Sequence, residues 1–335
     1  MNIGIVTPAP PESRSGNRVT AIRWAKILRK LGHRVVISQT YNGEAFDMLV
    51  ALHARRSSGS IRRFRRIHAD APLILALTGT DLYRDLSKSK EAQRSLDFAT
   101  RIVVLQPQAL AELRPAWRKK ARVVHQSVSQ FKRPHPRLSV KGFDVCVVGH
   151  LRPVKDPFRA AMAARVLPQS SRIRVIHLGV ALTATEAERA RLEMMSNTRY
   201  KWLGEVSPSK VAGVMSKSNL FVISSRMEGG ANALGEAIVA GLPVLASRIP
   251  GSIGILGDDY PGYFRVGDTR ELMRLMSRCE TEPRFLADLT RRCHGLAALF
   301  DPSREQSAWV DLLHELFGAP QHHGATRQEH RSRRC

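Results

Sequence analysis

The sequence is poor in cysteine, and the few cysteines that it has form no recognisable pattern. Among 335 residues there are four, Cys146, Cys279, Cys293 and Cys335, and none belongs to a CxxC pair. This spacing argues against a disulfide framework and against a zinc site, and it is typical of proteins from a reducing cytosol.

Long hydrophobic runs are also missing. No segment reaches the roughly 18 uncharged apolar residues that a membrane-spanning helix requires. The first ten residues, MNIGIVTPAP, lack the basic region and apolar run of a secretory signal peptide. We therefore expect a cytoplasmic protein without a membrane span, for which at most a weak electrostatic association with a membrane surface is left open.

Acidic residues are scarce relative to basic ones. Lys and Arg total 53 and Asp and Glu total 29, which gives a formal net charge of +24. Such a charge attracts polyanions, anionic lipid surfaces or phosphorylated small molecules, although a solvated arginine-rich surface explains it equally well. Aromatic residues make up only 6%, and the sequence shows no zinc-finger spacing, no aromatic-rich RNA-binding strand and no basic region joined to heptads. Charge alone therefore does not predict nucleic-acid binding.

What the sequence does contain is a regular alternation of short apolar runs with amphipathic segments. Runs of strand length, apolar on both faces as in buried parallel strands, occupy 2–7, 34–38, 48–52, 73–78, 101–105, 122–127, 144–150, 173–179, 201–204, 220–225 and 243–247. Between the first two, apolar residues recur at helical spacing, namely Val19, Ile22, Trp24, Ile27, Leu28 and Leu31. The alternation predicts α/β domains with parallel sheets.

One break in the alternation marks a domain boundary. The segment 132–142, KRPHPRLSVKG, has two prolines and no periodicity, so we interpret it as a linker. We place a first domain at 1–135, a second at 143–300 and a C-terminal helix at 301–317 that crosses back to the first. The polar, basic end 318–335 is expected to be a disordered tail.

Ligands of parallel α/β sheets bind where strands end and helices begin. After the first strand, Gly16 and Asn17 open a helix whose backbone N–H groups suit a phosphate. After the strand 144–150, Arg152 and Lys155 suit a diphosphate. After the strand 220–225, exposed N–H groups are expected at the start of the next helix, from Gly229, Gly230, Ala231 and Asn232.

Two carboxylates bracket that last turn. Seven residues separate Glu228, in the loop, from Glu236, in the following helix. Glu236 is placed to accept both hydroxyls of a ribose, and Glu228 to meet a second polyol such as a sugar. Taken as isolated residues, both are better explained as solvated acids near a helix N-terminus.

Four segments together narrow this choice. The sequence resembles the second domain of GT-B glycosyltransferases, in particular the large family-four group with its E-x7-E signature. The resemblance lies in four segments, in this order: VVGHLRPVKDP, WLGEV, NLFVISSRMEGGANALGEAIVAGLPVLAS and GYFRVGD. The resemblance implies two Rossmann-like domains facing across a cleft and no metal or other cofactor. It also implies that Glu236 binds the ribose of a sugar nucleotide, that Glu228 meets the donor sugar, and that a basic pair holds the diphosphate. His150 stands where the family has an arginine, so Arg152 is expected to substitute for it beside Lys155.

The first domain departs further from that family. TGTDLYRD, residues 78–85, looks like the motif H-G-[ST]-D with Thr78 in place of the histidine. By this resemblance Thr78, Asp81 and Glu228 are the catalytic positions and Thr80 lies with the acceptor. An alcohol acceptor needs help from a base, whereas an acceptor that arrives ionised does not.

Cations precede the helix that follows the third strand. His53, Arg55 and Arg56 stand just before the sequence SSGS, and cations at a helix N-terminus form an anion pocket. Arg18, beside Gly16, is the alternative acceptor-binding cation. We interpret the next arginines as a solvated helix face, namely Arg62, Arg63, Arg65 and Arg66.

The N-terminal segments VTPA, SGNRVTA, ALHARRS, LTGTDLYRD and VVLQ resemble the selenosugar synthases of selenoneine biosynthesis, a branch of the same GT-B group. This resemblance implies transfer of N-acetylglucosamine or glucose from a UDP-sugar to the selenium of selenophosphate. Two alternatives stay open: a metal-independent hexosyltransferase acting on a lipid or polysaccharide at the membrane, and a basic nucleic-acid-binding protein on an inactive scaffold.

Overall fold

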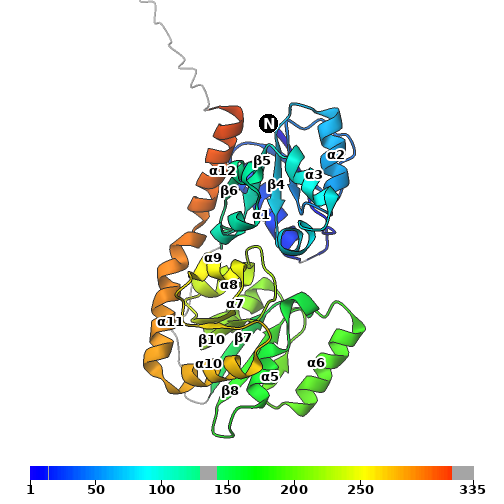
Figure 1. Ribbon diagram of the computed structural model, residues 1–335. Helices are drawn as coiled ribbons and strands as arrows, with labels where there is room; N and C mark the ends of the chain where they lie inside the picture. Colours follow the sequence, from blue (N-terminus) through cyan, green and yellow to red (C-terminus); the bar gives the residue numbers. More distant parts are fainter. Residues whose placement is uncertain (14, 129–141, 319–335) are drawn as a thin grey trace, which may run out of the picture.

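The structure is a computed structural model that describes residues 1–13, 15–128 and 142–318. Two α/β domains lie one above the other in Figure 1, each built on a parallel sheet with helices against it. This confirms the predicted fold class. The predicted linker 132–142 and tail 318–335 lie outside the described residues, apart from Gly142 and Gly318.

The first sheet has six strands within the described residues, in the order β2-β1-β3-β4-β5-β6. Their bounds are β1 (Asn2–Val6), β2 (Arg34–Ser38), β3 (Met48–Leu52), β4 (Leu73–Leu77), β5 (Arg101–Val104) and β6 (Ala121–Val123). The helices of this domain are α1 (Gly16–Lys30), α2 (Ser58–Ile67), the π-helical turn η1 (Asp81–Asp85), α3 (Lys90–Phe98), the 3₁₀ turn η2 (Pro107–Glu112) and α4 (Pro115–Lys119).

The second sheet has six strands in the described part of the chain, in the order β12-β11-β10-β7-β8-β9. They are β7 (Phe143–Val148), β8 (Ile173–Leu178), β9 (Tyr200–Trp202), β10 (Leu220–Ile223), β11 (Val244–Ser247) and β12 (Tyr263–Phe264). The helices are η3 (Pro153–Lys155), α5 (Arg159–Arg165), α6 (Ala184–Ser196), α7 (Pro208–Lys217), α8 (Asn232–Val239), α9 (Pro250–Leu256), α10 (Thr269–Thr281), α11 (Pro283–Leu296), η4 (Ala297–Phe300) and α12 (Pro302–Phe317).

Every strand pairing is parallel, and the pairings define where each sheet reverses its strand order. β1 pairs with β2 on one side and with β3 on the other. β7 likewise lies between β10 and β8. In open parallel sheets a ligand crevice opens at such a reversal, outside the carboxyl ends of the strands.

The central strands are buried on both faces, as predicted, but β2 is not. All five residues of β3 and of β4 are buried. β2 lies at the edge of its sheet, where Val36 is 53% exposed and only Val35 is buried. The strand β12 was not predicted, because a pair of residues is too short to show a pattern.

Helix α1 buries a narrower face than its apolar pattern predicts. Trp24 and Leu28 are buried against the first sheet, whereas Val19 and Ile22 are exposed, Ile22 by 51%. Small residues complete the buried face, which the hydrophobic spacing alone does not reveal.

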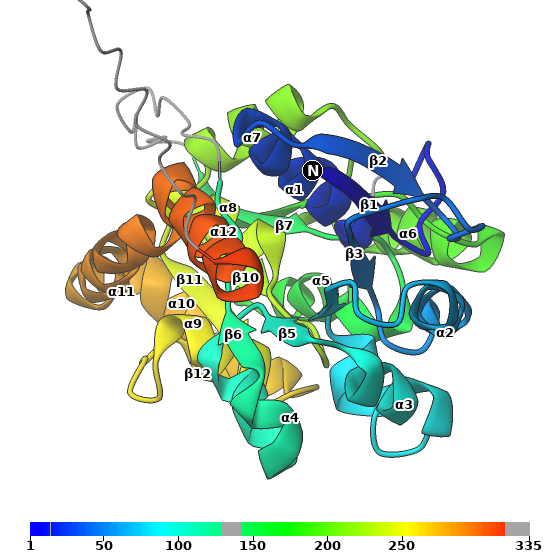
Figure 2. The same ribbon diagram turned by 90° about the horizontal axis from the view of Figure 1, so that it is seen from above.

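The C-terminal helices connect the two domains. In Figures 1 and 2, α12 runs alongside the first domain next to β6, and α11 lies against the second domain. Trp309 of α12 packs edge-to-face on Trp24 of α1, with 5.0 Å between ring centroids. Both tryptophans lie in a hydrophobic cluster of the first domain. In the described residues, every helix is too short or too polar to cross a membrane.

Candidate functional site

The candidate site lies where the loops of the two domains meet. The loop after β10 carries Glu228 and Gly229, and the loop after β4 carries Thr78 and Gly79. A Cβ added to Gly79 would lie 2.7 Å from the backbone nitrogen of Gly229, and one added to Gly229 would lie 2.5 Å from the carbonyl carbon of Thr78. Only glycines permit this approach of two backbones. The structure thus brings together Thr78 and Glu228, which are far apart in the sequence.

Glu228 is held on the second domain by two neighbours. Ser225, at the end of β10, donates its hydroxyl proton to Oε1 at 2.5 Å, and the Nζ of Lys155 forms an ion pair with the same oxygen. Oε2 of Glu228 has no such partner in the described chain, so the carboxylate keeps one oxygen for a ligand. Lys155, predicted to hold the diphosphate, therefore also fixes Glu228.

Glu236 lies one turn inside α8 and is partly buried. Desolvation raises the pKa of its carboxyl group, and the charge of the Arg23 guanidinium partly offsets this rise. No hydrogen bond to either carboxylate oxygen occurs within the described residues. A partly buried carboxylate without a donor is poorly solvated, which makes a pair of ligand hydroxyls a favourable partner.

The N-termini of α1 and α8 face each other across the cleft. A Cβ on Gly16 would lie 3.9 Å from Nδ2 of Asn232. Next to Gly16, two buried side-chain donors lack a hydrogen-bond partner in the described parts of the chain, namely Ser15 Oγ and Arg18 Nε, and in the second domain the same is true of Arg152 Nε. Unpaired buried donors are costly, and two helix N-termini add positive potential. The chemistry of these groups suits an anion such as a phosphate.

His53 dominates the first domain's side of the cleft. It follows β3 in a left-handed backbone conformation with φ of 76°, and it is buried. The backbone N–H of Arg56 donates to Nδ1 at 3.3 Å, and Nε2 lies 3.2 Å from the Thr80 hydroxyl. Burial lowers the pKa of His53, so the ring is neutral at pH 7. Because Nδ1 accepts a hydrogen bond, the proton of the neutral ring lies on Nε2. The lone pair of Nδ1 is already used by the N–H of Arg56.

Asp81 occupies a different position from the one predicted for a catalytic group. It is completely buried, and its oxygens accept the backbone N–H groups of Thr78, Gly79 and Ala54 at 2.9, 2.9 and 3.0 Å. Because its side chain is completely buried and most of its acceptor sites are taken by backbone N–H groups, Asp81 is not exposed to the cleft. Asp81 therefore shapes the turn that carries Thr78 and Thr80, and it is a positioning residue.

Arg55 and Arg56, predicted to act together as an anion-binding pair, have different surroundings in the structure. Arg55, 46% exposed, donates from Nε to Asp85 at 2.9 Å, and Arg84 pairs with the other oxygen of Asp85 at 3.0 Å. Arg56 is exposed and its side chain makes no hydrogen bond or ion pair in the described residues. Arg55 is thus partly neutralised, which the sequence did not indicate because Asp85 lies 30 residues away.

One of the arginines interpreted as solvated is not. Arg65 donates to the carbonyl oxygens of Ala69, Ala71 and Phe98, and to the hydroxyl of Thr100, at 2.6 to 3.3 Å. It therefore ties the end of α2 to the neighbouring loops. Its companions on the helix are exposed as predicted, namely Arg62, Arg63 and Arg66.

Sequence reasoning missed two residues of the site. Arg23 of α1 donates from Nη2 to Oδ1 of Asn232 at 2.9 Å, which joins the domains. Ser225 orients Glu228. Ser225 lies within the segment NLFVISSRMEGG, which was singled out for its glycines and Glu228 and not for this serine. Arg23 lies in none of the quoted segments and meets its partner 209 positions along the chain, so no local pattern identifies it.

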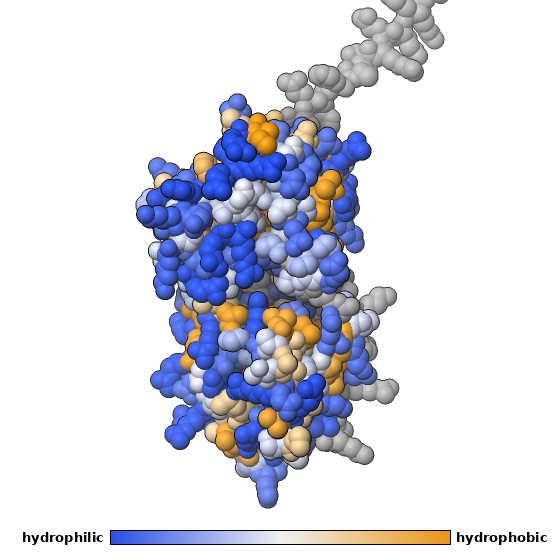
Figure 3. Space-filling view, turned by 90° about the vertical axis from the view of Figure 1, so that its right-hand side faces the viewer, coloured by the Kyte–Doolittle hydropathy of each residue, from blue (hydrophilic) through white to orange (hydrophobic). Residues whose placement is uncertain are grey.

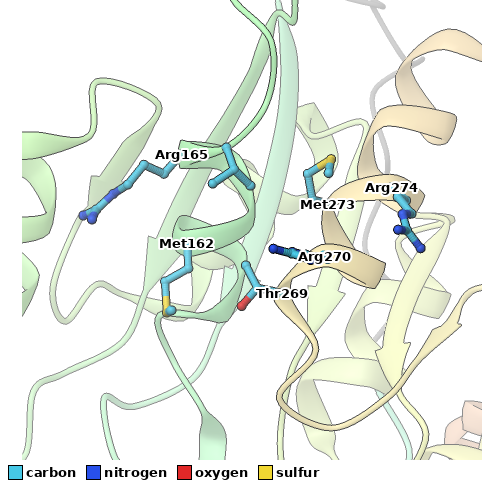
Figure 4. Close-up of a pocket in the computed structure, with 7 residues that line it drawn as sticks. Met162, Arg165, Thr269, Arg270, Met273 and Arg274 are labelled. Atoms are coloured by element: carbon cyan, nitrogen blue, oxygen red, sulfur yellow. The ribbon is translucent and has the colours of Figure 1, made fainter.

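A surface cavity of about 440 Å³ lies elsewhere, between α5 and α10 (Figure 4). The residues labelled there are Met162, Arg165, Thr269, Arg270, Met273 and Arg274. It is lined by helix side chains and not by strand ends, so we do not assign the donor site to it. No cluster of three or more potential metal ligands occurs among the described residues.

Part of the sequence, and the fold as a whole, are similar to those of known proteins. Residues 128–291 match the family model of glycosyl transferases group 1. The fold is similar to that of HepE from Anabaena, solved in complex with UDP and glucose, with a TM-score of 0.75 and 15% identity over 94% of this chain and 100% of that one.

Two further structures show the same fold. Sucrose-phosphate synthase from Thermosynechococcus elongatus gives a TM-score of 0.75 at 17% identity, covering 95% of this chain and 100% of that chain. A glycosyltransferase from Rickettsia africae gives 0.72 at 12% identity, covering 94% and 98%. At these identities the likeness is one of fold.

Proposed function

We propose that the protein is a selenosugar synthase, on the premise that its residues 128–291 match the family model of glycosyl transferases group 1. It transfers N-acetylglucosamine or glucose from a UDP-sugar to the selenium of selenophosphate and releases UDP. UDP accompanies the Anabaena relative in its structure, which supports the choice of nucleotide. The N-terminal motifs described above support the selenium acceptor.

The donor would bind between the two domains. We assign the ribose diol to Glu236, the donor sugar to Glu228, and the diphosphate to Arg152, Lys155 and the N–H groups of Gly229 to Asn232. Gly16 and Asn17, at the start of α1, complete the phosphate contacts. The unpaired donor of Arg152 and the facing helix N-termini support this assignment.

The observation that carries the acceptor assignment is the state of His53. Its Nδ1 accepts the backbone N–H of Arg56, so the imidazole next to Thr80 offers a proton and no lone pair. Thr78 has no basic group either. A site whose imidazole offers the acceptor a proton and no free lone pair suits a nucleophile that arrives already ionised, and a selenium anion is one.

The reaction follows from this arrangement. A selenium lone pair attacks the anomeric carbon, the bond from that carbon to the UDP oxygen breaks, and the electron pair leaves with UDP. Arg152 and Lys155 would stabilise the charge that develops on the diphosphate. Release of the free selenosugar then requires water to cleave the bond between selenium and phosphorus.

An assay of UDP release tests the proposal. A panel of UDP-sugars is offered with and without selenophosphate, and the products are identified by mass spectrometry. We expect UDP release to depend on selenophosphate and to accompany a selenium-containing sugar. Release that is equal without selenophosphate, or that requires a lipid or polysaccharide acceptor, would contradict it.

A further inference from the structure

Arg23 is a cation of the first domain that reaches into the second. It lies in the middle of α1, and its Nη2 donates to Oδ1 of Asn232, the first residue of α8. Its Nη1 is buried and has no hydrogen-bond partner within the described residues. An arginine in this position leaves one donor unused, so packing alone does not account for it.

Two carboxylates from different parts of the chain act on Arg23. Burial lowers the pKa of this guanidinium, and the charges of Glu305 and Glu236 raise it. Glu305 belongs to α12 and Glu236 to α8. Asn232, which Arg23 contacts, precedes Glu236 by four residues in α8 and therefore lies on the same face of that helix as the carboxylate that we assign to the ribose.

The two carboxylates differ in how their oxygens are used. Glu305 is buried, and it accepts the indole N–H of Trp24 at 2.8 Å and both the N–H and the hydroxyl of Ser127 at 2.8 and 2.5 Å. The carboxylate of Glu236 accepts no hydrogen bond from the described part of the chain. Glu305 is thus a fixed anchor, whereas the oxygens of Glu236 stay available to a ligand.

The same helix α8 touches the place where the chain passes between the domains. Val128, the last described residue before the interdomain segment, donates its N–H to the carbonyl of Phe300 at 3.0 Å. The ring of Phe300 lies over Gly235, where an added Cβ would come within 2.8 Å of it. Gly235, which contacts Phe300, directly precedes Glu236. The contact between Val128 and Phe300 therefore lies next to the carboxylate that we assign to the ribose.

We propose that Arg23 is a positioning residue of the donor site, which holds Asn232 and Glu236 against the anchor Glu305 so that nucleotide binding requires the first domain and α12. This inference rests on the proposed donor assignment. A partly buried ribose carboxylate needs a counter-charge to stay ionised, and the counter-charge comes from the opposite domain. The nucleotide would then bind weakly to the second domain when the two domains separate.

Calorimetry with UDP alone tests this role. Arg23→Met removes the charge and keeps the length of the side chain, and we expect a Kd for UDP that is about ten- to a hundredfold higher. Arg23→Lys should recover part of the loss. Lys26→Met, an exposed change on the same helix, is the matched control and should stay within about twofold of wild type.

A second arm separates positioning from a merely structural contribution. In a Glu236→Ala background, Arg23→Met should raise the Kd for UDP by less than about threefold, because its partner is gone. If Arg23→Met does not fold, Arg23→Gln, which keeps a donor for Asn232, replaces it in both arms.

The outcomes are distinguishable. An unchanged Kd for folded Arg23→Met, or equal effects with and without Glu236, would overturn this inference and leave the donor assignment intact. A wild-type protein that does not bind UDP would overturn both. UDP binding without selenium transfer would overturn only the proposed acceptor.

Discussion

Glu236 combines partial burial with unused hydrogen-bonding capacity. If its carboxylate holds the ribose diol, Glu236→Ala should weaken UDP binding by about 1.5 to 3 kcal/mol, with the fold intact. Isothermal titration calorimetry measures this directly. Glu228→Ala should instead lower turnover, because its expected partner is the sugar. Normal UDP affinity in Glu236→Ala would contradict the ribose assignment. Poor UDP affinity with normal turnover in Glu228→Ala would reverse the two roles.

Gly229 permits a close approach of the backbones of the two domains. A methyl group there would overlap the carbonyl of Thr78, so Gly229→Ala should force the loops apart and lower turnover by at least tenfold, about 1.4 kcal/mol. Gly213 of α7 has nothing within 4 Å of an added Cβ, so Gly213→Ala is the control and should leave turnover unchanged. Equal turnover in both variants would show that the contact is not needed for reaction.

Residues assigned from motifs and residues found only in three dimensions differ in the range of their contacts. Glu228 and Lys155 follow strand ends, and Glu236 lies in the next helix, all within a recognisable pattern, so their neighbourhood was predictable. Arg23 finds its partner across the interdomain cleft, and Asp81 looks like a catalytic acid until its three backbone donors are seen. A sequence pattern reports the type of a side chain, and burial decides whether it can touch a ligand.

Among the elements, strands of the core were the most predictable. The apolar run of β3 has the predicted bounds and most other strands differ by a residue or two, because buried parallel strands are apolar throughout. β2 also has the predicted bounds although it is a partly exposed edge strand, and β6 ends at Val123, four residues earlier than predicted. The helical face of α1 was predicted less well, since Thr20, Ala21 and Ala25 fill it and are too small to stand out.

The start of α2 is the element on which the acceptor assignment depends. If Arg55 and Arg56 bind the anion, Arg55→Ala and Arg56→Ala should each raise the acceptor KM by about one to two decades and leave the UDP-sugar KM nearly unchanged. The pairing of Arg55 with Asp85 makes Arg56 the stronger of the two. Steady-state kinetics with each substrate varied in turn measure the effect.

The same helix supplies the controls for that experiment. Arg62 and Arg63 are exposed, so their alanine variants should change neither KM appreciably. If Arg55→Ala and Arg56→Ala behave like them, the anion pocket lies elsewhere, and Arg18 is the next candidate. Thr78→His should not accelerate selenium transfer, because an ionised nucleophile gains nothing from a base.

Helix α12 is fastened to the first domain by Glu305. Glu305→Ala would leave the indole N–H of Trp24 and the N–H of Ser127 buried without an acceptor, so the free energy of unfolding should fall by about 3 kcal/mol. Urea denaturation followed by tryptophan fluorescence measures this. Glu315→Ala, on the same helix but in surface pairs with Arg101 and Arg122, should cost less than about 1 kcal/mol. A similar loss in both would contradict the anchor.

For the whole molecule, buried histidines make stability depend on pH. His177 is completely buried between the hydroxyl of Tyr200 and the carbonyl of Gly149, and burial lowers its pKa to about 4. Since the unfolded pKa is about 6.5, the unfolded chain binds more protons between these values. Stability is therefore complete above about pH 6.5 and falls on acidification, by about 2 kcal/mol at pH 5 from this group.

Denaturation midpoints at pH 7.5 and pH 5 measure the effect, and His177→Asn should reduce the difference between them. The remaining slope would come from other histidines with lowered pKa, namely His33, His53 and His125. A midpoint that rises on acidification would contradict the assignment of His177 as neutral.

The net charge of +24 belongs to the surface of the whole molecule. Figure 3 shows hydrophilic residues covering most of one face of the first domain, with hydrophobic residues scattered over the second. Many of the arginines are tied into surface ion pairs, and such pairs contribute little to stability.

The return of α12 to the first domain has a consequence for how the chain is made. Trp309, Leu312 and Leu313 belong to the hydrophobic cluster that also contains Trp24 and the buried residues of β1 and β3. During synthesis, the first 128 residues leave the ribosome long before these side chains do. Trp24 of the first domain therefore lacks its contact with Trp309 until the second domain has been synthesised. The first domain therefore emerges first from the ribosome but is completed last. A chimera that exchanges the second domain must keep residues 302–317 together with the first domain.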